Sequence, residues 1–91
     1  MRFEWDKEKA KQNNKKHKVS FDEAVSIFYD PLSATFNDPD HSDTEQRLIT
    51  IGYSLRQRLL IVSHTERGKT IRIISARLAN KQERKRHENK E

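Results

Sequence analysis

The sequence contains no cysteine, only two glycines and two prolines, and one tryptophan. Without cysteine the chain forms no disulfide and no thiolate metal site, and nothing in it points to an oxidising compartment. No apolar run approaches the roughly 20 residues that a membrane helix needs, and the N-terminus has no signal-peptide pattern. We therefore expect a cytoplasmic protein that does not act at a membrane.

Several motifs of cofactor chemistry are also missing. The sequence has no Gly-rich phosphate loop, nucleotide-binding fingerprint, metal-ligand motif or Ser-His-Asp order, so an enzyme built from it is expected to work without a cofactor. Only the acidic segment at residues 37–43, with three aspartates and a histidine, has a composition that suggests a metal site. Its spacing is not that of a calcium loop, and we expect a loop without a metal there.

With 91 residues the chain has the length of a single domain, residues 1–91, with a thin core. Its 36% of charged residues exceeds its 32% of hydrophobic ones, yet the hydrophobic residues gather in strong local patterns. We therefore expect a folded centre with solvated ends.

Charge is distributed in blocks along the chain, and the net charge is +5. Residues 1–18 carry +4, residues 19–46 carry −7 without a single Lys or Arg, residues 47–77 carry +6, and the remaining tail carries +2. Such blocks are often only solvated surface. The most basic block, however, is also the most strand-like, and a sheet with spaced arginines favours a phosphate-binding surface, most simply for RNA.

Two helices are predicted in the first third of the chain. Asp6 is a suitable N-cap for a polar helix over Lys7–Lys16. The spacing of Ser20 and Glu23 is that of a capping box, in which each side chain satisfies the other residue's backbone N–H, and it opens a core helix that ends before Pro31.

Alternating and continuous apolar patterns predict the sheet. The strand candidates are Leu32–Phe36, Arg47–Tyr53, Leu59–Thr65 and Thr70–Leu78. Short polar turns join the last three of them. Asn80 and Glu83 then open a basic helix over residues 81–87. The predicted fold is therefore α+β, with two N-terminal helices, an antiparallel meander of about three to five strands and a basic C-terminal helix. We expect the helices on one face of the sheet and the other face free for a partner.

RNA cleavage suits a chain without cofactors, because the ribose 2′-hydroxyl is its own nucleophile and the protein need only orient it, move protons and place positive charge at the phosphate. Arginine suits the last role. Arg72 is the best candidate, since Ile71 and Ile73 take the core and leave Arg72 on the opposite face. Arg67 and Arg77 come next. Arg77 has the parity of the isoleucines and is expected to emerge at the end of the strand.

Further residues of the same region have two interpretations each. His64 is a proton carrier or a strand-end histidine without a task, and Glu66 transfers protons or pairs with Lys69 in the turn. An odd loop places His64 and Arg72 on one face of the sheet, and an even loop places them on opposite faces. Trp5 anchors the core or stacks on a base. Cations that could guide RNA are Lys69, Lys81, Arg84 and Lys85.

Taken in order, the sequence resembles the BrnT family, the toxin half of a bacterial type II toxin–antitoxin system. The matching segments are Phe3-Glu4-Trp5-Asp6, residues 16–24 (KHKVSFDEA), residues 38–43 (DPDHSD), residues 65–68 (TERG) and residues 71–77 (IRIISAR). The resemblance implies a RelE-like fold and an endoribonuclease activity that arrests growth. It also implies an antitoxin of the BrnA type, which neutralises the toxin and binds operator DNA. Carried over residue by residue, it points to Trp5, Glu66, Arg67, Arg72 and Arg77.

The chain departs from the family pattern at two positions. Lys18 stands where the family commonly has a glycine, at a helix C-cap where left-handed backbone is easiest for glycine. His64 stands where the family often has an aromatic residue such as tyrosine, so a catalytic role of His64 is specific to this chain.

Two other classes of function compete with a ribonuclease. The first is a basic module that binds nucleic acid without cutting it, for example as an autoregulatory factor, which salt-sensitive binding without cleavage would reveal. The second is an interaction protein whose acidic middle and basic sheet pair with other chains. A toxin shares part of this behaviour, because an antitoxin has to cover its basic face.

Overall fold

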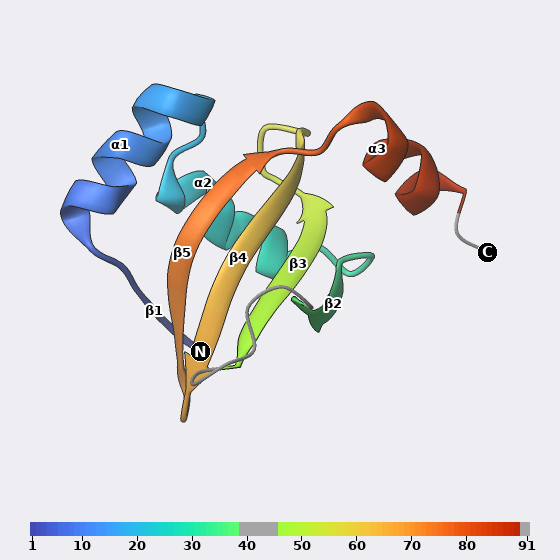
Figure 1. Ribbon diagram of the computed structural model, residues 1–91. Helices are drawn as coiled ribbons and strands as arrows, with labels where there is room; N and C mark the ends of the chain where they lie inside the picture. The colour runs from blue at the N-terminus through green and yellow to red at the C-terminus, as the bar shows by residue number, and fades with distance from the viewer. Residues whose placement is uncertain (39–45, 90–91) are drawn as a thin grey trace.

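The computed structural model describes residues 1–38 and 46–89, which form a five-stranded sheet with helices on both faces (Figure 1). The elements are β1 (Arg2–Glu4), α1 (Lys7–His17), α2 (Phe21–Ser26), the 3-10 helix η1 (Ile27–Tyr29), β2 (Ala34–Asn37), β3 (Arg47–Tyr53), β4 (Leu59–Arg67), β5 (Thr70–Leu78) and α3 (Lys81–Glu88). The predicted α+β class is confirmed. Within these residues no helix combines the length and the apolar character that crossing a membrane requires.

The sheet has the strand order β1-β5-β4-β3-β2. Strands β2 to β5 pair antiparallel, as the predicted meander requires, whereas β1 pairs parallel to β5. Strand β1 was not predicted, because three residues are too few to show a period and the partner lies about 70 residues away in the chain. Its pairing sets Glu4 directly beside Arg72.

One face of the sheet, called the α1/α2 face, carries α1, α2 and η1 and holds the larger core. In Figure 1, α2 lies behind the strands. The buried residues of this core are Val19, Phe21, Ala24, Ile27, Leu60, Val62, Ile71, Ile73 and Ala76. η1 packs so closely on β3 that a Cβ at Gly52 would lie 3.0 Å from the Ser33 Cβ and 3.2 Å from the Ile27 carbonyl oxygen.

Asn13 fastens α1 to the outer edge of β5, at a point that β1 is too short to cover. Its Nδ2 donates to the carbonyls of Ala76 (2.8 Å) and Val19 (3.0 Å), and its Oδ1 accepts from the Ala76 N–H (3.1 Å). The amide side chain thus replaces a neighbouring strand and satisfies buried backbone groups that would otherwise be unpaired. This explains why α1, whose polar sequence has almost no apolar face, packs firmly on the sheet.

Lys18 ends α1 in the left-handed conformation, with φ 61° and ψ 33°. A residue with a Cβ is strained there, whereas glycine is not. We predict that Lys18→Gly raises the free energy of unfolding by about 1 kcal/mol. Urea denaturation checks this, with Lys16→Gly as the matched control. The same replacement inside the helix should lower the stability by about 1 kcal/mol, and a loss in both variants would contradict the assigned strain.

The capping box predicted for α2 forms only in part. The Ser20 hydroxyl accepts from the Glu23 N–H at 3.0 Å, as expected. The Glu23 side chain, however, turns away from the helix start and binds Arg58 and Ser54 of the β3–β4 connection. Glu23 is therefore a link between α2 and the sheet. An ion-pair partner 35 residues further along the chain outcompetes the local backbone.

The helix α3 packs on the opposite face of the sheet, called the α3 face, so the prediction that all helices share one face is wrong. The capping box that opens α3 is confirmed: Asn80 Oδ1 accepts from the Glu83 N–H and the Glu83 carboxylate accepts from the Asn80 N–H, both at 2.8 Å. Tyr53 of β3 donates to Glu88 at 2.9 Å and its ring lies against His87. These contacts hold α3 over one end of the sheet and leave the other end of this face without a helix.

Candidate nucleic-acid interface

The turn between β4 and β5 decides which of the predicted site residues share a face. Arg67 and Thr70 are cross-strand partners, so Gly68 and Lys69 form a two-residue turn, with Gly68 at φ 62°. An even loop places His64 and Arg72 on opposite faces. His64 pairs with Ile73 and lies on the α1/α2 face, and Arg72 lies on the α3 face as predicted.

An arginine cluster, defined as Arg2, Arg67 and Arg72, occupies the α3 face beside this turn. Arg72 is the β5 partner of Glu4, and its Nη1 donates to the Glu4 Oε2 at 3.1 Å while both side chains stay partly exposed. Two residues closer to the turn than Arg72, Thr70 is flanked by Arg2 and Arg67. Cross-strand partners point to the same face. The cluster therefore presents three guanidinium groups and one carboxylate on a single surface.

Glu66 is not part of this surface. Its β5 partner is Ile71, a core residue, so the register turns the Glu66 side chain toward the α1/α2 face. Glu66 is exposed at the end of β4. The structure therefore separates Glu66 from Arg72 by the thickness of the sheet, and the carboxylate that does lie beside Arg72 is Glu4.

A β-bulge changes the face of Arg77. The pairing shifts between Ser63 and His64, so that Ser63 faces Ser75 and His64 faces Ile73, and Ile74 becomes the extra residue. One extra residue reverses the alternation beyond it. Arg77 thus pairs with Ile61 on the α3 face, and the prediction that it shares the face of Ile71 and Ile73 is wrong.

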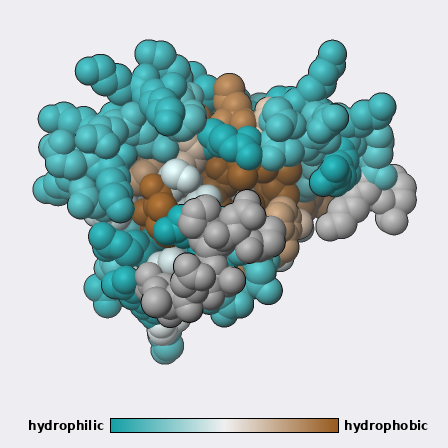
Figure 2. Space-filling view, viewed as in Figure 1, coloured by the Kyte–Doolittle hydropathy of each residue, from teal (hydrophilic) through white to brown (hydrophobic). Residues whose placement is uncertain are grey.

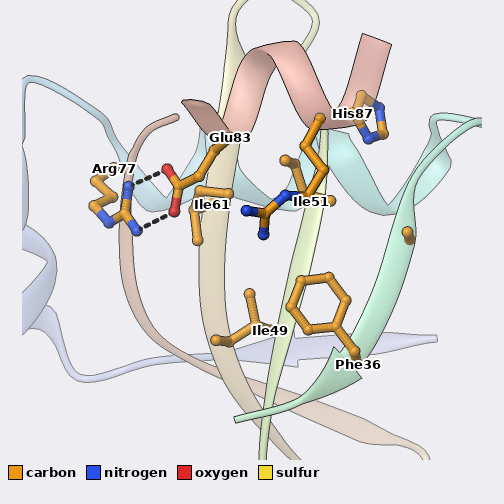
Figure 3. Close-up of a pocket in the computed structure, with 9 residues that line it drawn as sticks. Phe36, Ile49, Ile51, Ile61, Arg77, Glu83 and His87 are labelled. Atoms are coloured by element: carbon orange, nitrogen blue, oxygen red, sulfur yellow. Dashed lines mark hydrogen bonds and ion pairs between the residues drawn. The ribbon is translucent and has the colours of Figure 1, made fainter. Parts of the chain in front are cut away.

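The Arg77 guanidinium is already engaged. Its Nη1 and Nη2 donate to the two carboxylate oxygens of Glu83 at 2.8 and 2.9 Å (Figure 3). These hydrogen bonds raise the pKa of Arg77 and lower the pKa of Glu83 from their ordinary values. Arg77 joins β5 to α3 in the free protein, and a phosphate that takes both of these donors has to displace Glu83.

Between the arginine cluster and α3 the α3 face has an apolar pocket of about 340 Å³. Figure 2 shows hydrophobic residues in the middle of this face with hydrophilic surface on both sides. The pocket floor is formed by β2, β3 and β4 and its rim by β5 and α3 (Figure 3). The lining residues are Ala34, Phe36, Ile49, Ile51, Ile61, Arg77, Glu83, Arg86 and His87. An apolar floor with cations at its rim suits the flat faces of nucleobases better than it suits a phosphate.

The helix α3 adds cations at the far end of this face. Lys81, Arg84 and Lys85 are all exposed or nearly so, and Arg84 lies 3.8 Å from Glu88 in an i, i+4 ion pair. From Arg72 to Arg77 the strand rises by roughly 15 Å. The predicted cations therefore fall into two groups at the two ends of one face, with Lys69 in the turn of the first group and the pocket between them.

The sequence model of one protein family, described as the ribonuclease toxin BrnT of a type II toxin–antitoxin system, matches residues 5–83. The chain belongs to the BrnT family. The crystal structure of the Brucella abortus ribonuclease toxin BrnT is similar in fold, with a TM-score of 0.66 and 24% sequence identity over 89% of this chain and 99% of the other. No curated protein matches the chain. The resemblance inferred from the sequence is thereby confirmed.

His64, one of the residues predicted from the sequence to carry protons, lies in the core. It is 1% exposed, its Nε2 is 2.8 Å from the Thr50 hydroxyl, and its ring packs edge-on against Phe28. Burial lowers its pKa from 6.5 to about 4. The imidazole is therefore neutral and out of reach of RNA, so the structure contradicts its prediction as a catalytic proton carrier.

The burial of His64 predicts a pH dependence of stability. Because its pKa is depressed in the folded state, its contribution is complete above pH 6.5 and is lost as the pH falls toward the folded pKa of about 4. We expect the free energy of unfolding to fall by about 2 kcal/mol between pH 7.5 and pH 5. Urea denaturation at both values measures it. His64→Phe keeps the ring packing and the other histidines, and should remove most of the difference; an unchanged difference would contradict the assignment.

Trp5 lies with the core residues and not beside the arginine cluster of the α3 face. Its ring meets Phe21 edge-on with centroids 5.8 Å apart, and it packs against the larger core. Of its two predicted roles the structure supports the anchor. Of the acidic segment at residues 37–43, residues 39–43 lie outside the described residues. Within residues 1–38 and 46–89, no three His, Asp or Glu side chains gather as metal ligands.

Sequence reasoning missed Arg2 and Glu4 as neighbours of Arg72. Both lie on β1, and only the parallel pairing with β5 brings them to the α3 face. The alternation of Arg2, Phe3 and Glu4, with the apolar residue between two charged ones, was the available signal. It could have indicated a strand with one face in the core, although not which strand it joins.

Proposed function

We propose that this chain is an endoribonuclease that binds single-stranded RNA on its α3 face and cuts it without a metal. The observation that carries the proposal is the arginine cluster beside the β4–β5 turn, in which a partly exposed ion pair joins Arg72 to Glu4. Such a pair contributes little to stability, so a phosphate can take the place of Glu4 at small cost. The chain's membership of a ribonuclease toxin family supports the same function.

The chemistry needs only groups that RNA and this face supply. The 2′-oxygen attacks the adjacent phosphorus and loses its proton to a base, the bond from phosphorus to the 5′-oxygen breaks, and the leaving oxygen takes up a proton. The products are a 2′,3′-cyclic phosphate and a 5′-hydroxyl. Arg72 and Arg67 stabilise the extra negative charge on the phosphorane through forked, permanently charged donors. Bases of the substrate rest on the apolar pocket, and the cations of α3 guide the strand.

The proposal does not give equal roles to the predicted residues. Arg72 and Arg67 contact the phosphate, and Arg77 does so after releasing Glu83. Glu66 lies on the other side of the sheet, so its neutralisation should affect cleavage less than the loss of Arg72. Glu4 is the carboxylate placed to accept a proton beside Arg72.

In its cellular setting the proposed nuclease arrests growth until a cognate antitoxin covers the α3 face. The BrnT resemblance supports an antitoxin of the BrnA type, which also binds the operator DNA. The apolar pocket and the surrounding cations fit an acidic, partly apolar antitoxin segment.

Incubation of the purified chain with a long single-stranded RNA in EDTA tests this function, with a DNA strand of the same sequence as control. We expect cleavage of the RNA into fragments that end in cyclic phosphate, and an intact DNA strand. RNA that is bound in a salt-sensitive manner but stays intact, with and without ribosomes, would replace the nuclease by the non-catalytic binding module. Cleavage that EDTA abolishes would contradict the metal-free mechanism.

A further inference from the structure

A row of four side chains crosses the α3 face next to the arginine cluster. The register pairs Arg47 of β3 with Thr65 of β4, Thr65 with Arg72 of β5, and Arg72 with Glu4 of β1. Cross-strand partners share a face, so Thr65 lies between two arginines. Neighbouring strands are about 4.8 Å apart, which sets the Cα atoms of the two arginines about 10 Å from each other.

The Thr65 hydroxyl has no structural task within the described residues. Thr65 is 2% exposed, and its Oγ1 has no hydrogen-bond partner there. A buried hydroxyl without a partner is unfavourable, and valine has nearly the same shape without this cost. An unsatisfied polar group of this kind in a native protein calls for an explanation, and a catalytic role or a bound ion is among the known ones.

Arg47 carries a charge that no carboxylate of the described residues neutralises. The ion pairs of residues 1–38 and 46–89 join Arg56 and Arg58 to Glu23, Arg72 to Glu4, Arg77 to Glu83 and Arg84 to Glu88, and none includes Arg47. The side chain is nevertheless partly buried. A partly buried arginine without a counter-charge among the described residues, beside a hydroxyl that has no partner among them, is the arrangement expected where an anion is to be bound.

We propose that Arg47 holds, together with Arg72, the phosphate at which the RNA is cut, and that the Thr65 hydroxyl between them is a third donor to it. The inference rests on the proposed function and adds two catalytic residues to it. Two extended arginine side chains easily bridge the separation of their Cα atoms by meeting at one phosphate above β4. Thr65 is covered in the free protein, so its contact with the phosphate requires the groups over it to move when RNA binds.

The first test compares Arg47→Gln with Arg56→Gln. Arg56 is an exposed arginine at the opposite end of the same strand pair, so it controls for the loss of one positive charge. We expect Arg47→Gln to lower kcat/KM for RNA cleavage by about 100-fold, as removal of one oxyanion donor does, and Arg56→Gln to change it less than about threefold. Equal activities of the two variants would overturn the role of Arg47.

The second test uses Thr65→Val and measures both cleavage and thermal stability. Loss of a purely structural hydroxyl lowers the melting temperature, whereas loss of an unpaired phosphate donor lowers cleavage and raises the melting temperature. We expect kcat/KM to fall about tenfold, the value of one hydrogen bond to a charged group, while the melting temperature rises by about 4 °C because the unsatisfied hydroxyl is gone. Unchanged cleavage, or a fall in both quantities, would overturn the role of Thr65.

Binding to a 2′-O-methyl RNA, which lacks the nucleophile, keeps this inference separate from the proposed function. Arg47→Gln should weaken binding and reduce the salt dependence by about one counterion. If the wild type binds this RNA through Arg47 but cuts no RNA, the nuclease proposal fails and the phosphate site stands. If the wild type cuts RNA and Arg47→Gln neither binds more weakly nor cuts more slowly, the phosphate site fails and the nuclease proposal stands.

Discussion

Arg72→Ala is expected to lower kcat/KM for RNA cleavage by about a thousandfold, at the upper end of the effect of removing one oxyanion donor. Arg72 stands between Thr65 and Glu4 in the row of side chains that crosses the α3 face. Among the described residues its guanidinium makes one hydrogen bond, to Glu4. The measurement is single-turnover cleavage of a short RNA in EDTA. Arg72→Lys keeps the charge but loses the planar fork, so we expect it to recover only a small part of the activity.

Two comparisons make this prediction specific. Arg84→Ala removes an exposed cation of α3 and should slow cleavage less than about tenfold, because the role proposed for Arg84 is to guide RNA without contact to the reacting phosphate. Glu66→Gln should likewise retain more activity than Arg72→Ala, since the register turns Glu66 to the other face. A larger loss from either control than from Arg72→Ala, with all variants folded, would contradict the central position of Arg72.

Glu23→Gln is expected to lower the free energy of unfolding by about 3 kcal/mol, the lower end of the cost of breaking a buried ion pair from one side. The Glu23 side chain is 6% exposed and binds the Nε and Nη2 of Arg58 and the Ser54 hydroxyl. These contacts, chiefly the hydrogen bonds from Arg58, lower the pKa of Glu23. Glutamine keeps the shape but leaves the Arg58 charge without a partner. Urea denaturation at pH 7 measures the loss.

The double variant Glu23→Gln, Arg58→Met is the control, because it removes both charges and keeps the packing. We expect the free energy of unfolding of the double variant to lie close to that of the wild type, well above that of Glu23→Gln alone. If the double variant is as unstable as the sum of the two single variants, the ion pair is not the cause. The depressed pKa of Glu23 also implies that its contribution is present above its ordinary pKa of 4.5 and is lost as the pH falls through its lower folded value.

Local patterns were sufficient for most of the elements. The predicted bounds Arg47–Tyr53 and Thr70–Leu78 are those of β3 and β5, because alternating apolar residues on a two-faced strand are a strong signal. The same alternation placed Arg72 on the correct face. The N-caps Asp6, Ser20 and Asn80 all accept backbone hydrogen bonds as predicted, since capping depends only on the next two or three residues.

The failures all depend on partners distant in the chain. The bulge at Ile74 reverses the face of Arg77, and no single-strand pattern reveals a bulge. The Glu23 side chain binds Arg58 and not the N-terminus of its own helix. His64 lies in the core against Phe28, a position that the alternation of its strand allows but that is unusual for a polar residue. Thr65 and Arg47 were overlooked because each is unremarkable alone, and only the register across three strands brings them together with Arg72.

A basic surface alone does not identify the RNA site, because α1 is also rich in cations. Its lysines are Lys7, Lys9, Lys11, Lys15 and Lys16. They lie on a helix that packs against the larger core, on the other side of the sheet. The α3 face instead combines forked donors with an apolar pocket.

The most direct measurement is therefore a map of backbone amide chemical-shift changes in NMR spectra on adding a 2′-O-methyl RNA oligonucleotide. We predict that the largest changes fall on Arg47, Thr65, the β4–β5 turn and Arg72, extend to α3, and leave α1 nearly unchanged. Changes concentrated on the lysines of α1, with the β4–β5 hairpin silent, would contradict the assignment of the RNA site to the α3 face.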